Sequence, residues 1–393
     1  LDPTRPVTEA IAGAVWTKKS PAFDQLDEML DIVGYNYDWR PMPQSHTLYP
    51  ERLMMTTESH PFDMYSIWQQ IEKSPWIIGD FVWTGMDYLG ESGVGYEKTE
   101  NEKEKVDLLP EADADLIKSI GQYSDLFLQF GRRWPWFNAY CGDIDIIGNK
   151  KPQSYYRDVV WNRSEMEIAV HTPMLPDTRY LLSLWGWPDE LACWTWPGEE
   201  GKTLKVSIYT HCTSVRLELN GKVIGEQKTA SDTKTDRSVF QMSLIDLPLR
   251  AVFEVPYSPG ELKAIGLTDG KEVVTKVLKS AGEPDKIVLT PDRYTIAADR
   301  NDLAYVTVEI ADKKGNIIPN ADLNVNLAIS GNGELIAAGN GSPDQMTSFR
   351  QPHCRLNNGK ALVILRPFAR SGNISLSASS DGLSPASIEI EVK

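Results

Sequence analysis

The chain has 393 residues, of which 41% are hydrophobic and 24% charged, a balance typical of soluble globular proteins with roughly two to four domains. Its formal net charge of −15 argues against a nucleic-acid or anionic-membrane surface, because either would require clustered Lys and Arg side chains. No apolar run approaches the roughly 20 residues that span a bilayer, and the N-terminus shows no signal peptide.

The first 163 residues alternate short apolar strands with stretches able to form helices. Strands are predicted at 5–11, 30–37, 52–59 and 76–85, with helices at 20–30, 63–74 and, closing the segment, 153–162. Repeated strand-then-helix units favour a parallel sheet. Four strands cannot close an eight-stranded (β/α)8 barrel, so this segment is predicted to hold half of one.

Polar and aromatic residues collect at the ends of three of these strands. In a parallel barrel the active site lies at the C-terminal ends of the strands. Glutamate is a poor strand former, so Glu58 at the end of an apolar run is either a solvated loop residue or a group held for chemistry. The residues at these ends are Asn36, Tyr37, Glu58, His60, Trp83 and Asp87.

Beyond residue 163 the pattern changes to short β-branched strands separated by Gly, Asn, Asp and Pro. Strands are predicted at 204–210, 304–312 and 386–392, with an Asn-Gly hairpin at 215–225. All twelve Trp residues lie at or before Trp196, which also indicates two kinds of domain. We therefore predict domains at 1–163, 164–281 and 282–393, the last two being immunoglobulin-like β-sandwiches.

Four sequence strings in this chain identify a family. The strings are "DIVGYNY", "TTES", "DFVWTGMDYLGE" and "PWFNAYCGDIDIIGNKKPQSYYRDVVW". Together they resemble the C-terminal part of glycoside hydrolase family 2, most closely its bacterial β-galactosidase-like members with additional C-terminal sandwich domains. The resemblance implies a retaining β-glycosidase with a TIM barrel, in which the four strands are the fifth to eighth.

The resemblance also implies roles for the strand-end residues. Glu58 matches the nucleophile, and Tyr37 matches a tyrosine that contacts it, so Tyr37 is expected to donate a hydrogen bond to Glu58. Trp83 matches the aromatic floor of the sugar subsite, where a flat ring packs against a pyranose.

Four further residues near these strand ends have other expected roles. Asn36 is a candidate ligand for a sugar hydroxyl, although strand alternation would turn either Asn36 or Tyr37 away. Asp87 is a candidate hydroxyl-binding carboxylate, and His60 either contacts substrate or caps its loop. Glu91 is interpreted as a loop charge.

Retaining hydrolysis needs a second carboxyl group as acid/base. In the family it belongs to an Asn-Glu pair at the end of the fourth strand, and no segment of this sequence matches it. Glu9 and Asp38 would lie opposite Glu58 only by accident. The expectation is therefore a chain that has little activity alone and works with a missing N-terminal portion of the same enzyme.

Two alternatives remain open at this point. A β-glucuronidase would use an Asn-x-Lys pair for the sugar carboxylate, which Asn149 and Lys151 offer. A non-catalytic carbohydrate-binding module would instead present the Trp-rich stretch 184–198 to a polysaccharide.

The remaining expectations concern cofactors, location and assembly. The four cysteines lack metal-ligand spacing, and neither a metal nor another cofactor is implied. The family's use of external glycans suggests a periplasmic or extracellular location. The expected partner is a carbohydrate, with no nucleic acid or membrane, and the oligomeric state stays open.

Overall fold

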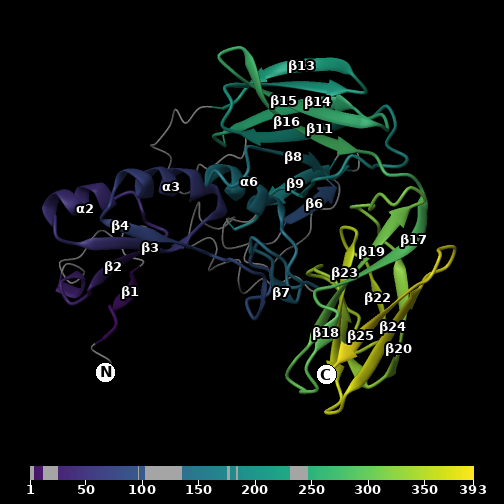
Figure 1. The fold of residues 1–393 in the computed structure, drawn as a ribbon. Helices are drawn as coiled ribbons and strands as arrows, with labels where there is room; N and C mark the ends of the chain where they lie inside the picture. Colours follow the sequence, from purple (N-terminus) through teal and green to yellow (C-terminus); the bar gives the residue numbers. More distant parts are fainter. Residues whose placement is uncertain are drawn as a thin grey trace.

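The computed structural model describes residues 4–11, 25–95, 97–101, 135–174, 178–182, 185–230 and 247–393. Figure 1 shows a parallel sheet near the N-terminus and two larger groups of strands beyond it. In the described part of the chain, no helix is long and apolar enough to cross a membrane.

The N-terminal sheet has four parallel strands in the order β1-β2-β3-β4. Its helices α2 and α3 lie on one side of it (Figure 1) and bury Met42 and Ile67 against Val33 and Met54 of the sheet. These strands are β1 (Thr8–Ile11), β2 (Ile32–Asn36), β3 (Leu53–Ser59) and β4 (Ile77–Val82).

All four predicted strands are present, each somewhat shorter than its sequence pattern. The helix predicted at 63–74 is α3 (Met64–Lys73), preceded by the 3-10 turn η1 (Pro61–Asp63), and the closing helix is α6 (Pro152–Val160). Helix α2 (Met42–Leu48) was not predicted from the sequence. It follows Pro41 and contains Pro43, which the helix accommodates because prolines fit the first helical turn. The helix predicted at 20–30 lies partly outside the described residues.

Close approach of β1 to β2 requires a glycine. A Cβ on Gly34 would lie 2.2 Å from the carbonyl oxygen of Glu9 and 2.5 Å from Cγ2 of Thr57. The absence of a side chain at this position therefore lets β1 pair with β2 in register.

The second part of the chain contains two antiparallel sheets that share one core. Their inner faces bury Ile168, Val206 and Phe253 from one sheet against Leu217 and Leu262 from the other. One sheet consists of β10 (Glu190–Leu191), β8 (Met166–His171), β11 (Thr203–Thr210) and β14 (Arg250–Pro256). The other consists of β13 (Lys222–Lys228), β12 (Ser214–Leu219), β15 (Glu261–Thr268) and β16 (Lys271–Lys279).

Helix α6 covers the outer face of the first of these sheets. Tyr156 and Val159 of α6 pack with Ala169 and Tyr209, which point away from the sandwich core. This second burial explains why β8 and β11 are almost continuously buried rather than alternating. The predicted hairpin is confirmed, with Asn220 and Gly221 both at positive φ as a type I′ turn requires.

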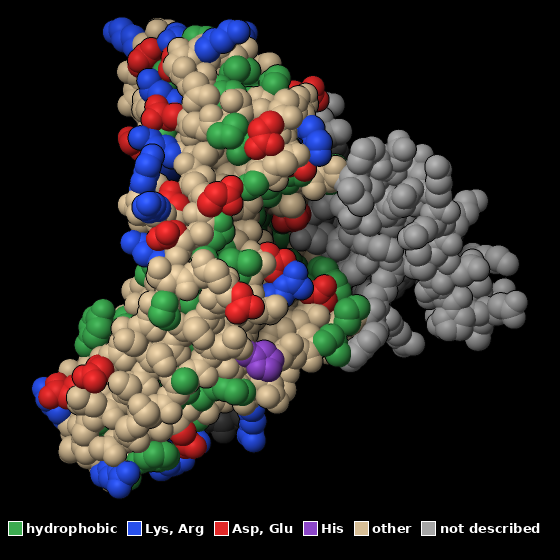
Figure 2. Space-filling view, turned by 90° about the vertical axis from the view of Figure 1, so that its right-hand side faces the viewer, with side chains coloured by type: hydrophobic (Ala, Val, Ile, Leu, Met, Phe, Trp, Pro, Cys, Tyr) green, Lys and Arg blue, Asp and Glu red, His purple; other side chains and the backbone are tan. Residues whose placement is uncertain are grey.

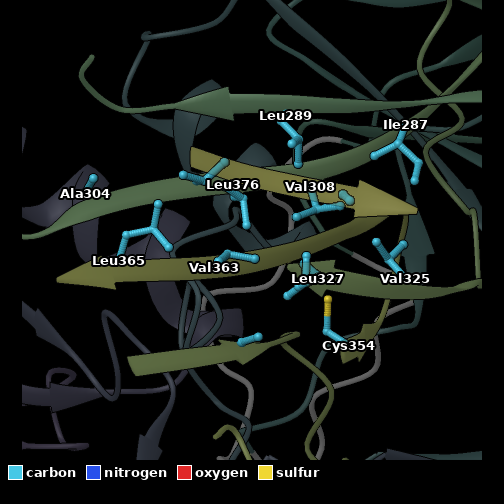
Figure 3. Close-up of a cluster of buried hydrophobic side chains, with 14 of the residues drawn as sticks. Ile287, Leu289, Ala304, Val308, Val325, Leu327, Cys354, Val363, Leu365 and Leu376 are labelled. Atoms are coloured by element: carbon cyan, nitrogen blue, oxygen red, sulfur yellow. The ribbon is translucent and has the colours of Figure 1, made fainter. Parts of the chain in front are cut away.

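The C-terminal part also has two sheets around one core, shown in Figure 3. Val308 and Val363 meet Leu327 and Leu376 from the opposing sheet. The predicted strands 304–312 and 386–392 match β19 and β25. One sheet consists of β17 (Pro284–Pro291), β19 (Ala304–Asp312), β23 (Lys360–Pro367) and β21 (Gly333–Gly339). The other consists of β18 (Thr295–Ile296), β25 (Ala386–Val392), β24 (Gly372–Ser379), β20 (Asn324–Gly331) and β22 (His353–Arg355).

Short ladders and polar contacts link these parts. Two minor sheets pair β5 (Tyr88–Leu89) with β7 (Asn138–Ala139) and β6 (Glu97–Asn101) with β9 (Thr178–Leu182). The Asn320 side-chain amide donates to the Thr195 carbonyl, and the Phe137 N–H donates to the Pro343 carbonyl at 3.0 Å. Acidic and basic side chains are interspersed on the face seen in Figure 2.

Candidate active site

The structure brings the ends of β2, β3 and β4 to one edge of the parallel sheet. Asn36 pairs with Glu58, and Ser59 pairs with Val82, so the residues that follow these strands are neighbours. We call Asn36, Tyr37, Glu58, His60 and Trp83 the strand-end site.

Tyr37 is the central hydrogen-bonding residue of this site. Its backbone N–H donates to the Glu58 carbonyl at 2.8 Å, and its hydroxyl lies beside the half-buried Glu58 side chain. Burial, and after it the neighbouring Glu58 carboxyl group, raises the pKa of Tyr37 well above 10.0. The phenol is therefore protonated at neutral pH and has a proton to donate, while its role as the donor to Glu58 stays a prediction.

Backbone geometry resolves the question of strand alternation. Tyr37 lies one residue beyond β2 and has a φ of 59°, in the left-handed region that few residues other than glycine adopt. It is therefore outside the strand's alternation and reaches Glu58. Asn36 remains in the strand, where its Oδ1 accepts a hydrogen bond from the Thr57 hydroxyl at 3.1 Å.

His60 packs in an aromatic group beside the Tyr37 phenol. Its ring lies 4.4 Å from that of Tyr37 and 5.5 Å from that of Trp185, and it is 4% exposed. His60 precedes η1, but its side chain makes no capping hydrogen bond. The packing favours a role in supporting Tyr37 over loop capping.

Trp83 follows β4 and is half-buried. Its backbone N–H donates to the Ser59 carbonyl at 3.1 Å, and the peptide bond to Thr84 is cis. The indole lies edge-on to Tyr88, with 5.8 Å between the ring centroids. Tyr88 in turn donates to the exposed Glu91, which agrees with a loop charge at that position.

Asp87 is held away from solvent and has its own partners. The side chain is fully buried, and its Oδ1 accepts from the Gly142 N–H at 2.7 Å and from Lys151 Nζ at 3.1 Å. Burial raises the pKa of Asp87 to about 6, although Lys151 and the Gly142 N–H oppose this shift. This arrangement favours a structural role over the predicted binding of a sugar hydroxyl.

The structure also argues against an Asn149 and Lys151 pair that recognises a sugar carboxylate. Lys151 Nζ is already bound to Asp87 and to the Tyr140 carbonyl at 2.7 Å, and it lies over the Tyr140 ring. The Asn149 amide donates to Asp145 at 3.2 Å.

Trp185 and Asp80 also belong to the site, although the sequence analysis did not single them out. The Trp185 indole donates to the Tyr37 hydroxyl at 2.9 Å, across 148 positions of sequence. Asp80 of β4 accepts hydrogen bonds from the Thr56 and Ser59 hydroxyls of β3, and burial raises its pKa. A carboxylate that follows Ile77 and Gly79 in an apolar strand is an anomaly that the sequence alone displays.

The Trp-rich stretch 184–198 does not form the exposed aromatic platform that a carbohydrate-binding module needs. Trp187, Trp194 and Trp196 are 4%, 0% and 6% exposed. Trp194 packs in the core of the second part of the chain, and the Trp185 indole N–H donates to the Tyr37 hydroxyl. Within the described residues, no group of three or more His, Cys, Asp or Glu side chains is arranged to hold a metal ion.

Comparison with known proteins supports the family resemblance. Residues 287–389 match the model for glycoside hydrolase family 2 C-terminal domain 5, and residues 201–274 match a domain of unknown function. A glycosyl hydrolase family 2 member from Bacteroides cellulosilyticus has a similar structure, with a TM-score of 0.78 and 33% identity over 100% of this chain. The chain belongs to glycoside hydrolase family 2.

Other relatives are named for two different activities. The chain is 27% identical over its whole length to the β-galactosidase BoGH2A of Bacteroides ovatus. It is 26% identical over 76% of its length to a putative β-glucuronidase of Formosa agariphila. The chain spans 42% of BoGH2A and 45% of the Bacteroides cellulosilyticus protein, less than half of each.

Proposed function

We propose that this chain is part of a retaining β-galactosidase in which Glu58 is the nucleophile. The observation that carries the proposal is the position of the protonated Tyr37 phenol beside the Glu58 side chain at the C-terminal edge of a parallel sheet. A carboxylate that attacks an anomeric carbon must be both ionised and fixed in direction. A neutral phenol that donates to it meets both needs.

The neighbouring groups fit this role. Trp185 donates to the Tyr37 oxygen, which leaves the phenolic proton directed to Glu58. The half-buried Trp83 offers an indole face on which a pyranose can pack. On this proposal Glu58 forms a covalent glycosyl-enzyme intermediate, and a second carboxyl group roughly 5 to 5.5 Å away protonates the leaving oxygen.

We propose that the second carboxyl group belongs to a longer polypeptide of which this chain is one portion. The relatives extend well beyond the matched region, since the chain spans less than half of their length. Strand β4 is an edge of the parallel sheet, with Ile78 and Phe81 50% and 60% exposed. An apolar edge of this kind suits pairing with further barrel strands, which would complete a (β/α)8 barrel.

The test is covalent trapping in the full-length enzyme. A 2-deoxy-2-fluoro-β-galactoside with a good leaving group should inactivate it and add one sugar mass to the peptide that contains Glu58. Glu58→Gln should abolish both labelling and hydrolysis of nitrophenyl β-galactoside. Labelling of a different carboxylate would contradict the assignment of Glu58.

The choice of sugar is tested separately. The Formosa relative makes a glucuronide the second candidate, but Lys151 is held by Asp87 and cannot also bind a sugar carboxylate without breaking that pair. We therefore expect nitrophenyl β-galactoside to be cleaved with a higher kcat/KM than nitrophenyl β-glucuronide. Faster cleavage of the glucuronide would overturn this choice while leaving Glu58 as the nucleophile.

A further inference from the structure

A cavity of about 320 Å³ lies where three parts of the chain meet. Its walls come from the loop 145–151 and the start of α6, from residues 187–192, and from the C-terminal sandwich around Ile317 and Asn358. No residue of the strand-end site is part of the lining. The cavity is therefore a different place from the proposed active site.

The charged side chains that line the cavity are already engaged. Lys151 pairs with Asp87 at 3.1 Å, and Lys360 pairs with Glu309 at 3.7 Å. A ligand with a net charge would have to break one of these pairs. The other charged groups also have partners: Lys150 pairs with Asp158, Glu190 with His171 and Arg250, and Asp145 with the N–H groups of Ile147 and Asn149. Asp189 is not free either.

One buried polar atom at the cavity has no partner. Gln153 is 1% exposed and lines the cavity, and its Nε2 donates to the Gly142 carbonyl. Its Oε1 accepts no hydrogen bond from any group in the described part of the chain. A buried carbonyl oxygen without a donor is costly, so a ligand hydroxyl would satisfy this atom once a small rotation of the Gln153 amide turned it toward the cavity.

The remaining lining groups suit a sugar ring. Asn358 adds a side-chain amide from a turn at a φ of 48°, and Tyr155 adds a phenol. Tyr140 contributes aromatic surface, while Trp187, 4% exposed, only closes the wall behind it. Amides, a phenol and flat rings, with the charges internally paired, are the groups that bind a neutral polyol.

We propose that this cavity is a second carbohydrate-binding site, which takes a neutral monosaccharide or the end of a neutral oligosaccharide. It does not depend on the proposed chemistry at Glu58. Because its walls come from all three parts of the chain, a bound sugar would also hold the C-terminal sandwich against α6.

The experiment uses the full-length polypeptide with Glu58→Gln, so that the probe is not turned over. Titration with methyl β-D-galactopyranoside, followed by ligand-detected NMR and calorimetry, should show two binding events. Ala192→Phe fills the cavity from a lining position that has no polar side chain, and it should remove one event. Trp83→Ala should remove only the other.

A smaller substitution tests whether lost binding comes from the cavity itself and not from misfolding. Asn358→Gly removes the amide but tolerates the positive φ, and it should weaken the cavity event about three- to tenfold, as expected for one lost hydrogen bond. Sodium glucuronate should bind the cavity more weakly than the neutral glycoside. Each variant should retain the parent's thermal unfolding curve.

The outcomes separate the two proposals. A single event that Ala192→Phe leaves unchanged would overturn the cavity site, as would tighter binding of glucuronate to the cavity. Two events that both persist in Trp83→Ala, one of them removed by Ala192→Phe, would count against the proposed active site and leave the cavity site standing.

Discussion

Trp185 donates its indole N–H to the hydroxyl of Tyr37 at 2.9 Å, although 148 positions separate the two residues in sequence. The Glu58 side chain lies beside the same hydroxyl and contributes to its raised pKa. Trp185, Tyr37 and Glu58 therefore follow one another in space, so a residue outside the four-stranded parallel sheet orients the hydroxyl beside the proposed nucleophile.

Replacing Tyr37 by Phe should lower activity without unfolding the protein. The variant loses the donor to Glu58 while keeping the ring that packs on His60. We expect kcat of the full-length enzyme to fall about 10²-fold, as for loss of one preorganised donor, with little change in KM. Steady-state kinetics on nitrophenyl β-galactoside measures this.

A tyrosine two residues earlier, within β2, provides the matched control. Tyr35 is buried and donates to the Ser45 hydroxyl at 2.8 Å. Tyr35→Phe should cost about 1 kcal/mol of unfolding free energy and leave kcat unchanged. Equal kinetic losses in both variants would remove the special role of Tyr37.

Replacing Trp185 by Phe should act only through Tyr37. The expected fall in kcat is about three- to tenfold, because one orienting hydrogen bond is lost. If Trp185 works by positioning Tyr37, the double variant Tyr37→Phe/Trp185→Phe should be no slower than Tyr37→Phe. Additive losses in the cycle would show an independent role for Trp185.

Breaking the buried pair of Asp87 and Lys151 should destabilise the fold. Lys151→Met leaves the Asp87 carboxylate buried without its counter-charge and should cost about 3 to 5 kcal/mol of unfolding free energy. Denaturant unfolding of the full-length protein measures the change. The double variant Asp87→Asn/Lys151→Met should recover part of this loss, and no recovery would contradict the electrostatic explanation.

Asp87 should also make stability depend on pH. Its pKa is raised from 3.8 to about 6 on folding, chiefly by burial, so the folded chain binds this proton more tightly than the unfolded chain. The resulting stabilisation is complete below the unfolded pKa and is lost as the pH rises to about 6. Its size is on the order of 3 kcal/mol.

The comparison of parent and Asp87→Asn isolates this titration. Between about pH 4 and pH 7, the unfolding free energy of the parent should fall relative to that of Asp87→Asn. A difference that is constant across this range would show that the pKa of Asp87 is not raised.

Two glycines of the parallel sheet should respond differently to a methyl group. Gly34→Ala places a Cβ 2.2 Å from the Glu9 carbonyl oxygen and should cost about 1 to 3 kcal/mol through overpacking. Gly79→Ala meets nothing within 4 Å and should be close to neutral. Thermal unfolding of the two variants tests the pairing of β1 with β2.

Local signals in the sequence determined much of the fold. Alternating side chains predicted β19 and β25, and the Asn-Gly pair predicted the hairpin between β12 and β13. A further local signal, Asp-x-x-Gly-Asn, recurs at 145–149 and 312–316 and forms the same turn. In both copies the Asp Oδ1 accepts from the N–H groups two and four residues later.

The candidate site was only partly readable in this way. The sequence by itself put Glu58 and Tyr37 at neighbouring strand ends, because side-chain period, turn chemistry and parallel register are local rules. Only the tertiary structure decided that Asp87 pairs with Lys151, that Trp185 reaches Tyr37, and that Gln153 lines a cavity shared with Asn358. These contacts depend on how distant parts of the chain pack against one another. That packing also buries some polar groups, and no short stretch of sequence shows which of them remain free to bind a ligand.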